Sequence, residues 1–170
     1  MKQLLRFIDA FSEGLGRLCA WLTLVMAGLL LAVVVLRYGF SLGSIALQES
    51  VMYLHGIAFM LGAGYTLKQQ GHVRVDVFYR NFSERRQALV DFVGTLVLLL
   101  PVTLFIGFVS WDYVMMSWAR GEASAEAGGL AFVYVQKTLL LLFVVSMSLA
   151  GIAELIRNGA KLFGKEGEWH

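Results

Sequence analysis

The chain of 170 residues is 58% hydrophobic and 15% charged, and its mean hydropathy is +0.70. Soluble domains carry about 45–50% apolar and about 25% charged residues, so this composition indicates an integral membrane protein with no length left for a separate soluble catalytic domain. The net charge of +2 comes from basic residues in separate clusters rather than in one stripe, so we expect no nucleic-acid partner.

Four stretches with few or no charged residues are long enough to cross a membrane, because about 20 apolar residues cover the roughly 30 Å of hydrocarbon in a bilayer. The predicted spans are residues 18–36, 50–67, 92–111 and 132–156. The fourth contains Lys137, whose long side chain can carry its amine to the membrane surface. The sequence therefore predicts an all-α integral membrane protein, with four transmembrane helices in a single domain over residues 1–170.

The segment before the first span has the pattern of an amphipathic helix. Apolar residues recur at helical spacing, and most of the charged residues lie between them. These apolar residues are Leu4, Ile8, Phe11 and Leu15. Helices of this kind lie in the plane of the membrane interface, so we expect an interfacial N-terminal helix that leads into the first span.

Arg37 follows the first span directly, and Glu49 stands just before the second span on the same side of the membrane. A carboxylate at a helix N-terminus is stabilised by the helix dipole. Opposite charges at a membrane edge also offset the desolvation of one another. We therefore expect an ion pair between Arg37 and Glu49 in preference to a proton-carrying role for Glu49.

The second span combines one titratable residue with several small ones. His55 lies well inside the span, and no second histidine in a span could face it as a haem ligand, so we interpret His55 as packed between helices. Small residues that let helices approach closely recur in the first two spans. They are Gly28, Ala32, Gly56, Ala58, Gly62, Ala63 and Gly64.

Two local signals mark the later part of the chain. Residues 68–76 read Lys-Gln-Gln-Gly-His-Val-Arg-Val-Asp, where Gly71 suits the left-handed conformation that ends many helices. Composition alone favours a solvated basic loop here. In the third span, Pro101 is the only proline of the chain and is expected to kink the helix, because it removes one backbone hydrogen bond.

The basic residues predict how the spans are oriented. Of the fourteen Lys and Arg residues, eleven lie in the segments on the side of the two chain ends. The other side has only Arg37, Arg120 and Lys137. Because short cytoplasmic loops carry an excess of Lys and Arg, we expect both termini in the cytoplasm.

Several short motifs, in one order and spacing on a four-span chain, resemble the DctQ-type small membrane subunit of TRAP (tripartite ATP-independent periplasmic) transporters. They are Arg37-Tyr38, Gln48-Glu49, Leu61-Gly62-Ala63 and Gly71-His72-Val73-Arg74-Val75-Asp76. A later stretch is similar to one branch of these subunits, although Ala131 stands where that branch usually has a proline. It includes Ser117-Trp118, Gly121-Glu122, Ser124, Gly128-Gly129-Leu130 and Lys137.

The resemblance implies a secondary transport system of the bacterial inner membrane, driven by a sodium gradient. A DctP-type periplasmic binding protein would deliver the solute, commonly an organic acid, to a complex of a large DctM-type subunit and this multi-pass small subunit. The large subunit would hold the substrate and Na⁺ sites and move as an elevator. This chain would then be a non-catalytic scaffold, without a cofactor, surrounded by its partner and by membrane lipids.

The resemblance also selects candidate residues, none of them catalytic or metal-binding. Those expected to shape the architecture and the subunit interface are Arg37, Tyr38, Gln48, Glu49, Gly62, Lys68, Gly71, His72, Arg74 and Asp76. Those expected on the periplasmic side are Trp118, Glu122, Ser124, Gly128, Gly129 and Lys137. We expect Asp76→Asn or Glu49→Gln to lower uptake by weakening assembly with the large subunit.

Two other functions are compatible with four spans. One is a self-sufficient small transporter, coupled to protons through Glu49 and working as a homodimer. The other is a haem-carrying electron-transfer subunit, which would be coloured when purified. An enzyme is less favoured than either, because no nucleophile, base and orienting group occur together at a recognisable spacing.

Overall fold

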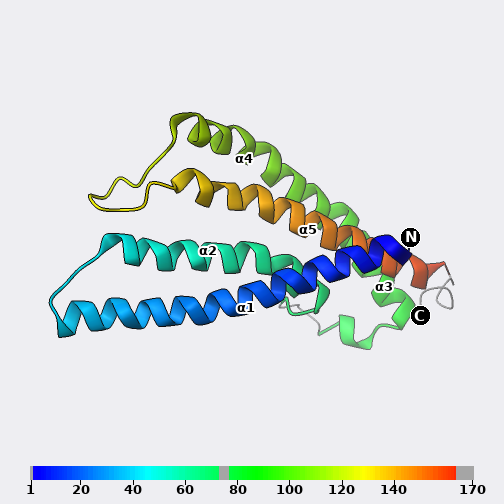
Figure 1. Cartoon of the computed structure of the whole chain (residues 1–170). Helices are drawn as coiled ribbons and strands as arrows, with labels where there is room; N and C mark the ends of the chain where they lie inside the picture. The colour runs from blue at the N-terminus through cyan, green and yellow to red at the C-terminus, as the bar shows by residue number, and fades with distance from the viewer. Residues whose placement is uncertain (1, 73–76, 164–170) are drawn as a thin grey trace.

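The computed structural model describes residues 2–72 and 77–163, and within these residues the regular secondary structure is entirely helical, with no strand (Figure 1). Its elements are α1 (Lys2–Gly39), α2 (Ile45–Lys68), the short 3₁₀ helix η1 (Tyr79–Asn81), α3 (Glu84–Gly94), the π-helical η2 (Thr95–Leu99), α4 (Leu100–Arg120) and α5 (Val133–Leu162). The segment from α3 to α4 is helical without a gap, over Glu84–Arg120. Four helical segments are therefore long and apolar enough to cross a membrane, which confirms the predicted all-α fold with four possible spans.

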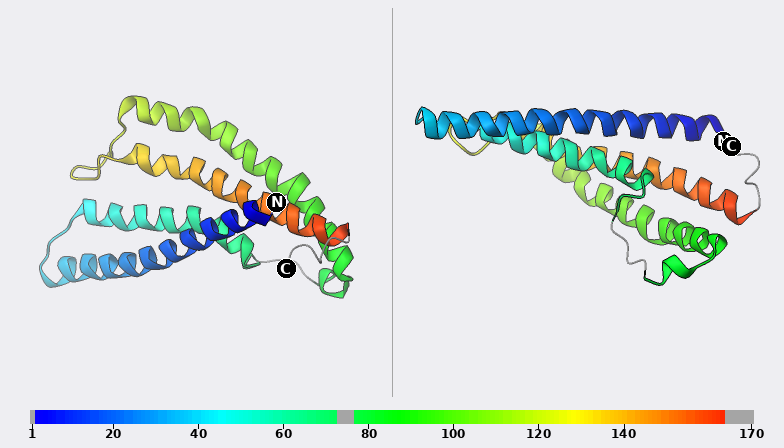
Figure 2. Two further views of the ribbon diagram at one scale, coloured as in Figure 1. Left: turned by 45° about the vertical axis from the view of Figure 1, so that its right-hand side comes forward. Right: turned by 90° about the horizontal axis from the view of Figure 1, so that it is seen from below.

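The four long segments lie side by side in the order α1, α2, α5, α4, so the fold is a layer of helices rather than a closed bundle. Each helix packs mainly on its neighbour in this order, and α3 extends the contact along α5. The layer is twisted, and the start of α1 crosses over α5 at the end of the molecule where the chain begins (Figures 1 and 2).

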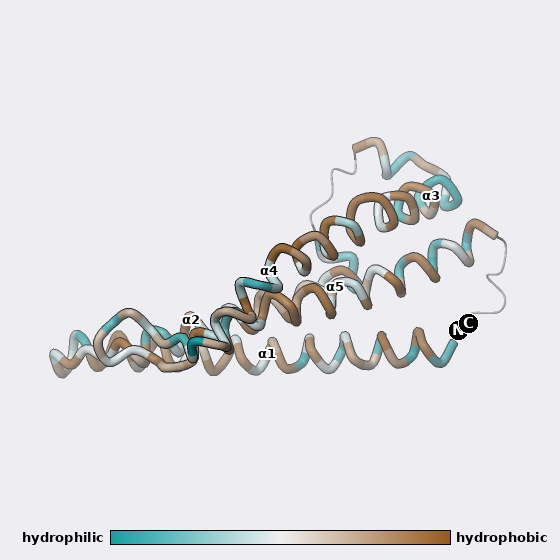
Figure 3. The backbone as a smooth tube through the Cα atoms, turned by 90° about the horizontal axis from the view of Figure 1, so that it is seen from above, coloured by the Kyte–Doolittle hydropathy of each residue, from teal (hydrophilic) through white to brown (hydrophobic). Residues whose placement is uncertain are grey.

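Few side chains are buried in this layer, because each helix has neighbours on two sides at most. The buried apolar residues of the described chain are Ile8, Leu67, Ala88, Val114, Leu139, Ala150 and Ala153. Large apolar side chains cover the outside of α1 and of the α3–α4 segment, while hydrophilic residues gather towards the ends of the helices (Figure 3). An apolar outer surface of this kind is stable only in lipid or against another membrane protein.

The N-terminal segment is helical as expected, but it is not a separate interfacial helix. Residues 2–39 form one continuous α-helix of 38 residues, with no break between the amphipathic segment and the first span. Ile8 and Ser12 are almost fully buried where α1 meets α5, so this face of the segment packs on protein. Leu4 and Phe11 of the same segment stay exposed, so its contact with the membrane interface remains a prediction.

The helix of the third span has an irregular turn just before Pro101, where the sequence predicts a kink. The residues before it, Thr95–Leu99, form a π-helix, in which the Leu100 N–H bonds to the Thr95 carbonyl five residues back. Widened turns of this kind accommodate a proline, which cannot donate its own backbone hydrogen bond. The widened turn also has a packing role, because a Cβ on Gly151 of α5 would lie 2.7 Å from the Leu99 side chain.

Glycines set the closest approaches between helices. A Cβ on Gly64 of α2 would lie 3.0 Å from the backbone oxygen of Ser146 in α5, and one on Gly16 of α1 would meet the Tyr65 ring at 2.6 Å. A Cβ on Gly62 would lie 3.6 Å from Cys19 Sγ of α1, an ordinary van der Waals distance. The predicted small-residue face of the second span is therefore used within the chain, whereas Gly28 of the first span faces open space.

Candidate functional site

Polar side chains gather at the two opposite ends of the layer. The first group, here called the loop cluster, joins α2 to the connection between α4 and α5; it consists of Glu49, Ser117, Trp118, Glu122, Ser124, Gly129, Leu130, Lys137 and Thr138. The second, here called the charged cluster, joins α1, α2 and α5 near the chain ends; it consists of Asp9, Glu13, Lys68, Glu154, Arg157 and Asn158.

Glu49 fastens the α4–α5 connection to the start of α2. Ser44 caps this helix by accepting a hydrogen bond from the Leu47 N–H at 3.3 Å, which places Glu49 in the next turn. One carboxylate oxygen of Glu49 accepts a short hydrogen bond from the Ser124 hydroxyl. The other accepts from the Leu130 N–H at 2.6 Å, so both oxygens hold the loop.

The loop closes around Glu49 because glycine stands at position 129. The Ser124 N–H donates to the Leu130 carbonyl at 2.9 Å, and the Gly129 N–H donates to the Glu126 carbonyl at 3.0 Å. A Cβ on Gly129 would lie 2.6 Å from the Ser124 Cβ and 2.8 Å from Glu49 Oε1. Only glycine fits this contact. Gly128 has a positive φ of 81°, which also favours glycine.

Glu122 and Lys137 form the second half of the loop cluster. The Lys137 ammonium lies 2.5 Å from Glu122 Oε2 and 4.0 Å from the centre of the Tyr113 ring. The Ser117 hydroxyl donates to the same carboxylate at 2.6 Å. The hydrogen bonds from Lys137 and Ser117 lower the pKa of Glu122 below its ordinary 4.5. The pair therefore ties the first turn of α5 to the end of α4.

Trp118 reinforces the same junction. Its indole N–H donates to the Thr138 hydroxyl at 2.8 Å, and its ring meets the Tyr134 ring edge to face at 4.7 Å. The α4 helix then ends at Gly121, whose φ of 55° is left-handed. All six candidates predicted for the periplasmic side thus lie in or beside one compact structure, and the structure adds Ser117 and Tyr113 to them.

The predicted ion pair between Arg37 and Glu49 is wrong. Within the described residues no ion pair involves Arg37, and both oxygens of Glu49 are used by the loop. The sequence separation explains the error. Arg37 is the basic residue nearest to Glu49 along the chain, whereas the partner in the structure, Ser124, lies 75 residues away and donates from a neutral hydroxyl. Tyr38, beside Arg37, is 81% exposed.

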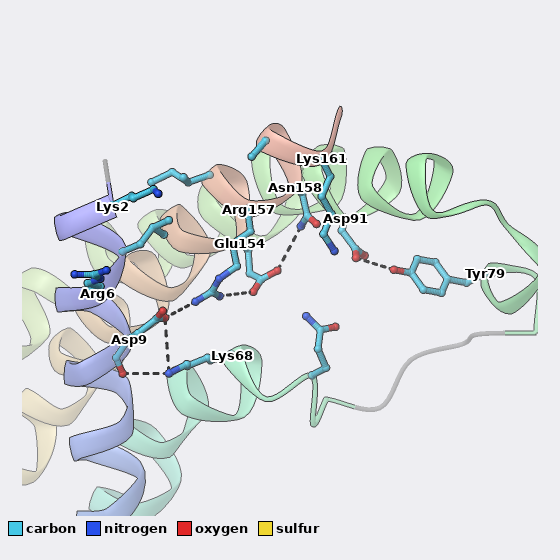
Figure 4. Close-up of a pocket in the computed structure, with 14 residues that line it drawn as sticks. Lys2, Arg6, Asp9, Lys68, Tyr79, Asp91, Glu154, Arg157, Asn158 and Lys161 are labelled. Atoms are coloured by element: carbon cyan, nitrogen blue, oxygen red, sulfur yellow. Dashed lines mark hydrogen bonds and ion pairs between the residues drawn. The ribbon is translucent and has the colours of Figure 1, made fainter. Parts of the chain in front are cut away.

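The charged cluster holds three helices together where α1 crosses α5 (Figure 4). Lys68 at the end of α2 lies 2.8 Å from Glu13 and 3.8 Å from Asp9, both on α1. Asp9 also pairs closely with Arg157 of α5, which in turn bonds Glu154 at 2.9 Å. Asp9 therefore sits between two cations from two different helices.

The α5 side of this cluster is buried. Glu154 is 7% exposed, and the neighbouring Asn158 donates to its carboxylate at 3.3 Å. Small residues before them, such as Ala150 and Gly151, leave room for the helix crossing. Three residues of this cluster on α5 were not predicted as site residues: Glu154, Arg157 and Asn158. Their spacing of three and four positions places them on one face of α5 beside small residues, and this pattern could have indicated them.

The segment after α2 is only partly described. Lys68 joins the charged cluster, and the exposed His72 makes no described contact. The left-handed residue that ends the helix is Gln70, with φ 55°, and not Gly71 as predicted. The Gly71 N–H instead completes the helix end by bonding the Thr66 carbonyl at 2.9 Å. The predicted interface residues Arg74 and Asp76 lie outside the described residues.

One face of α2 carries a line of exposed residues at helical spacing. From residue 45 to 68, only Gln48, Met52, His55 and Phe59 are exposed. The imidazole of His55, near the middle of the helix, stacks on the Phe59 ring at 6.2 Å. His55 is therefore not packed between helices of this chain, contrary to the prediction. We call these four residues the α2 stripe.

The chemistry that these groups support is structural. In the described part of the chain no three His, Cys, Asp or Glu side chains come together in a way that could hold a metal ion. The carboxylates of both clusters accept hydrogen bonds or pair with cations, so they fix helices and loops in place.

Comparison with known proteins identifies a family for most of the chain. The model of the DctQ component of tripartite ATP-independent periplasmic transporters matches residues 26–160, which include the loop cluster and the α2 stripe. No curated protein and no solved structure is significantly similar to the chain.

Proposed function

This chain belongs to the DctQ family, the small membrane subunits of tripartite ATP-independent periplasmic transporters, and we propose that it acts in its transporter as a rigid scaffold. Such a system has three parts, so a large membrane subunit and a binding protein are its partners. The family is a transporter component and not an enzyme family. We further propose that the complex lies in the bacterial inner membrane, that both termini of this subunit are cytoplasmic, and that sodium bound by the large subunit drives uptake of an organic acid.

The observation that carries the scaffold role is the open layer of helices. A self-contained carrier binds its solute near the middle of the membrane, typically between broken helices of two repeats. Here four segments lie in one layer, and the two polar clusters lie at its ends (Figures 1 and 3). A layer encloses no path, but it offers two broad faces on which a larger membrane protein can pack.

The two clusters explain why such a layer would be stiff. The loop cluster fixes α2, α4 and α5 at one end through Glu49, Glu122 and Lys137. The charged cluster fixes α1, α2 and α5 at the other end. Since α2 and α5 are held at both ends, the middle of the layer resists bending, as a support for a moving partner requires.

The α2 stripe supports a specific face for the partner. Polar side chains in the hydrocarbon region are costly when they face lipid. His55 is exposed near the middle of α2, and Gln48 lies on the same line two turns away. Because α2 is between α1 and α5, this line opens on one broad face of the layer. We therefore propose that the large subunit covers this face and hydrogen-bonds His55.

A proton-coupled carrier working through Glu49 is less well supported. Both oxygens of Glu49 accept hydrogen bonds from the α4–α5 connection, and Gly129 packs directly against the carboxylate. This geometry explains the acid as a loop anchor. Among the residues that the structure describes, no series of carboxylates leads from Glu49 into the middle of the layer.

The scaffold proposal is tested by replacing His55 with leucine in the chain co-expressed with its large subunit. If His55 hydrogen-bonds the partner, His55→Leu removes an interaction worth about 1 kcal/mol and lowers the association constant roughly fivefold. Co-purification in mild detergent and uptake by proteoliposomes with the binding protein should both fall. The stability of the isolated subunit should be kept or raised, because leucine suits lipid better.

The control is Phe108→Leu on α4, where Phe108 is 82% exposed and no polar residue needs a partner. This variant should assemble and transport as the unchanged protein does. If His55→Leu leaves both co-purification and uptake unchanged, the proposed face is wrong. Solute flux through the isolated subunit in liposomes would contradict the scaffold role itself.

A further inference from the structure

A pocket of about 610 Å³ opens beside the charged cluster, at the end of the molecule where α1 crosses α5 (Figure 4). Its walls come from four separate parts of the chain: the first turns of α1, the end of α2 with η1, the middle of α3 and the last turns of α5. This volume falls within the range of roughly 300–1,000 Å³ that small-molecule sites occupy.

The charge inside the pocket is unbalanced. Three acidic residues line it, and each is already engaged: Asp9 with Lys68 and Arg157, Glu154 with Arg157, and Asp91 with the Tyr79 hydroxyl at 2.7 Å. Three further basic residues, Lys2, Arg6 and Lys161, also line the pocket. None of these three pairs with an acidic group anywhere in the part of the chain that the structure describes.

The free cations come from two helices and face one space. Lys2 and Arg6 are one turn apart on α1, and Lys161 lies one turn after Arg157 on α5 (Figure 4). Basic side chains that line one pocket without acidic partners make it favourable for an anion. The paired Arg157 and Lys68 form the floor of the same space, so an anion in the pocket would meet up to five basic side chains.

The surroundings indicate an anion that carries hydrocarbon chains. Leu5, Ile156 and Ala160 contribute apolar lining to the pocket. On the outside of the same turns of α1, Leu4 and Phe7 are 48% and 66% exposed, so this part of the helix lies at an apolar medium rather than in free water. Basic pockets between membrane helices at this boundary are typical sites for acidic lipid headgroups.

We propose that this pocket binds the phosphate headgroup of an anionic phospholipid, which enters from the leaflet next to the chain ends. Lys2 and Arg6 supply positive charge from the α1 wall and Lys161 from the α5 wall, and the acyl chains lie along the apolar side of α1. The lipid thereby adds a further link between α1 and α5 beside the charged cluster and the packing of Ile8. This site is independent of the face that the large subunit covers.

The test is native mass spectrometry of the full chain, released from detergent with added phosphatidylglycerol or phosphatidylcholine. We expect phosphatidylglycerol to bind with saturation and phosphatidylcholine to bind at least tenfold more weakly. The double variant Arg6→Gln with Lys161→Gln should weaken phosphatidylglycerol binding at least tenfold, since each basic residue near an anionic lipid contributes about fivefold. The variant residues are exposed, so the fold is expected to persist, which circular dichroism checks.

The matched control is Arg85→Gln with Arg86→Gln, which removes two exposed charges from α3 at the same end without touching the pocket. It should change phosphatidylglycerol binding less than threefold. Equal weakening by both double variants would show general attraction to the membrane and overturn the site. A second arm adds inorganic phosphate, and complete displacement of the lipid by millimolar phosphate would overturn the lipid assignment in favour of a soluble phosphate ligand.

Discussion

The two ends of this molecule are held by different kinds of polar contact. At the loop cluster, half-buried carboxylates bind a short connection, and some partners are close in sequence, as Glu122 is to Ser117 and Lys137. At the charged cluster, side chains from three helices meet, and Asp9 and Arg157 are 148 residues apart. One end therefore shapes a loop, whereas the other end determines how the helices cross.

This difference predicts how each end fails. A buried charge that loses its partner is costly, because water cannot solvate the group that is left. A surface carboxylate that loses its partner is solvated at once and costs much less. Substitutions in the charged cluster should therefore weaken the whole layer, whereas substitutions in the loop cluster should loosen the connection and leave the helices folded.

The largest expected effect is that of Arg157→Ala. The variant leaves Glu154, which is 7% exposed, without its cation, and takes one of two cations from Asp9. We expect the free energy of unfolding to fall by about 3 kcal/mol, the lower end for breaking a buried pair because Arg157 itself is partly exposed. Reversible unfolding in mixed micelles measures this, with Arg85→Ala as the control that should change little. Equal losses in the two variants would contradict the structural role of the charged cluster.

The next effect is that of Gly129→Ala in the loop cluster. The added Cβ would lie 2.6 Å from the Ser124 Cβ and 2.8 Å from Glu49 Oε1, so the loop must shift. We expect the free energy of unfolding to fall by about 2 kcal/mol, which is typical of overpacking. Gly28→Ala, in open space on α1, should be neutral or stabilising, since alanine favours helix. Thermal unfolding of both variants measures the difference, and a Gly129→Ala variant as stable as the original protein would contradict the tight contact.

A smaller effect is expected for Glu49→Gln. The amide oxygen can still accept from the Leu130 N–H while the NH₂ group donates to the Ser124 hydroxyl, but both hydrogen bonds lose the charge that makes those of the carboxylate stronger. The α4–α5 connection should become more sensitive to protease while the helices stay folded, and co-purification of the large subunit should fall. Limited proteolysis separates this outcome from global unfolding. A Glu49→Gln connection as resistant as the original would mean that the carboxylate is not the anchor.

The smallest expected effect is a dependence of the loop cluster on pH. Hydrogen bonds from Lys137 and Ser117 lower the pKa of Glu122 below 4.5, so the charged form stabilises the folded loop. This stabilisation is complete above the ordinary pKa and is lost as the pH falls through the lowered value. Trp118 fluorescence, in a variant with Trp21, Trp111 and Trp169 replaced by phenylalanine, should shift only below pH 4.5. The same shift after Glu122→Gln would rule out Glu122 as its source.

The sequence predicts well what depends on local pattern. The four possible spans follow from runs of apolar residues that are continuous along the chain. Hydrophobic length is enough to place a membrane helix.

The sequence predicts poorly what depends on contacts between distant helices. The ion pair between Arg37 and Glu49 was inferred from proximity along the chain, whereas the loop that binds Glu49 arrives from the other half of the molecule. The pairing of Asp9 with Arg157 depends on the crossing angle of α1 and α5, which no local pattern encodes. For the same reason the continuous α1 and the exposed side of His55 appeared only in the structure.

We expect the large subunit to cover the α2 stripe and the outside of α4 to face lipid. Photo-crosslinking tests this most directly, with p-benzoylphenylalanine placed once at Phe59 and once at Phe108, which are 68% and 82% exposed. In membranes that contain the assembled transporter, the probe at position 59 should crosslink to the large subunit and the probe at position 108 to lipid alone. A large-subunit crosslink from position 108, with none from position 59, would contradict the account.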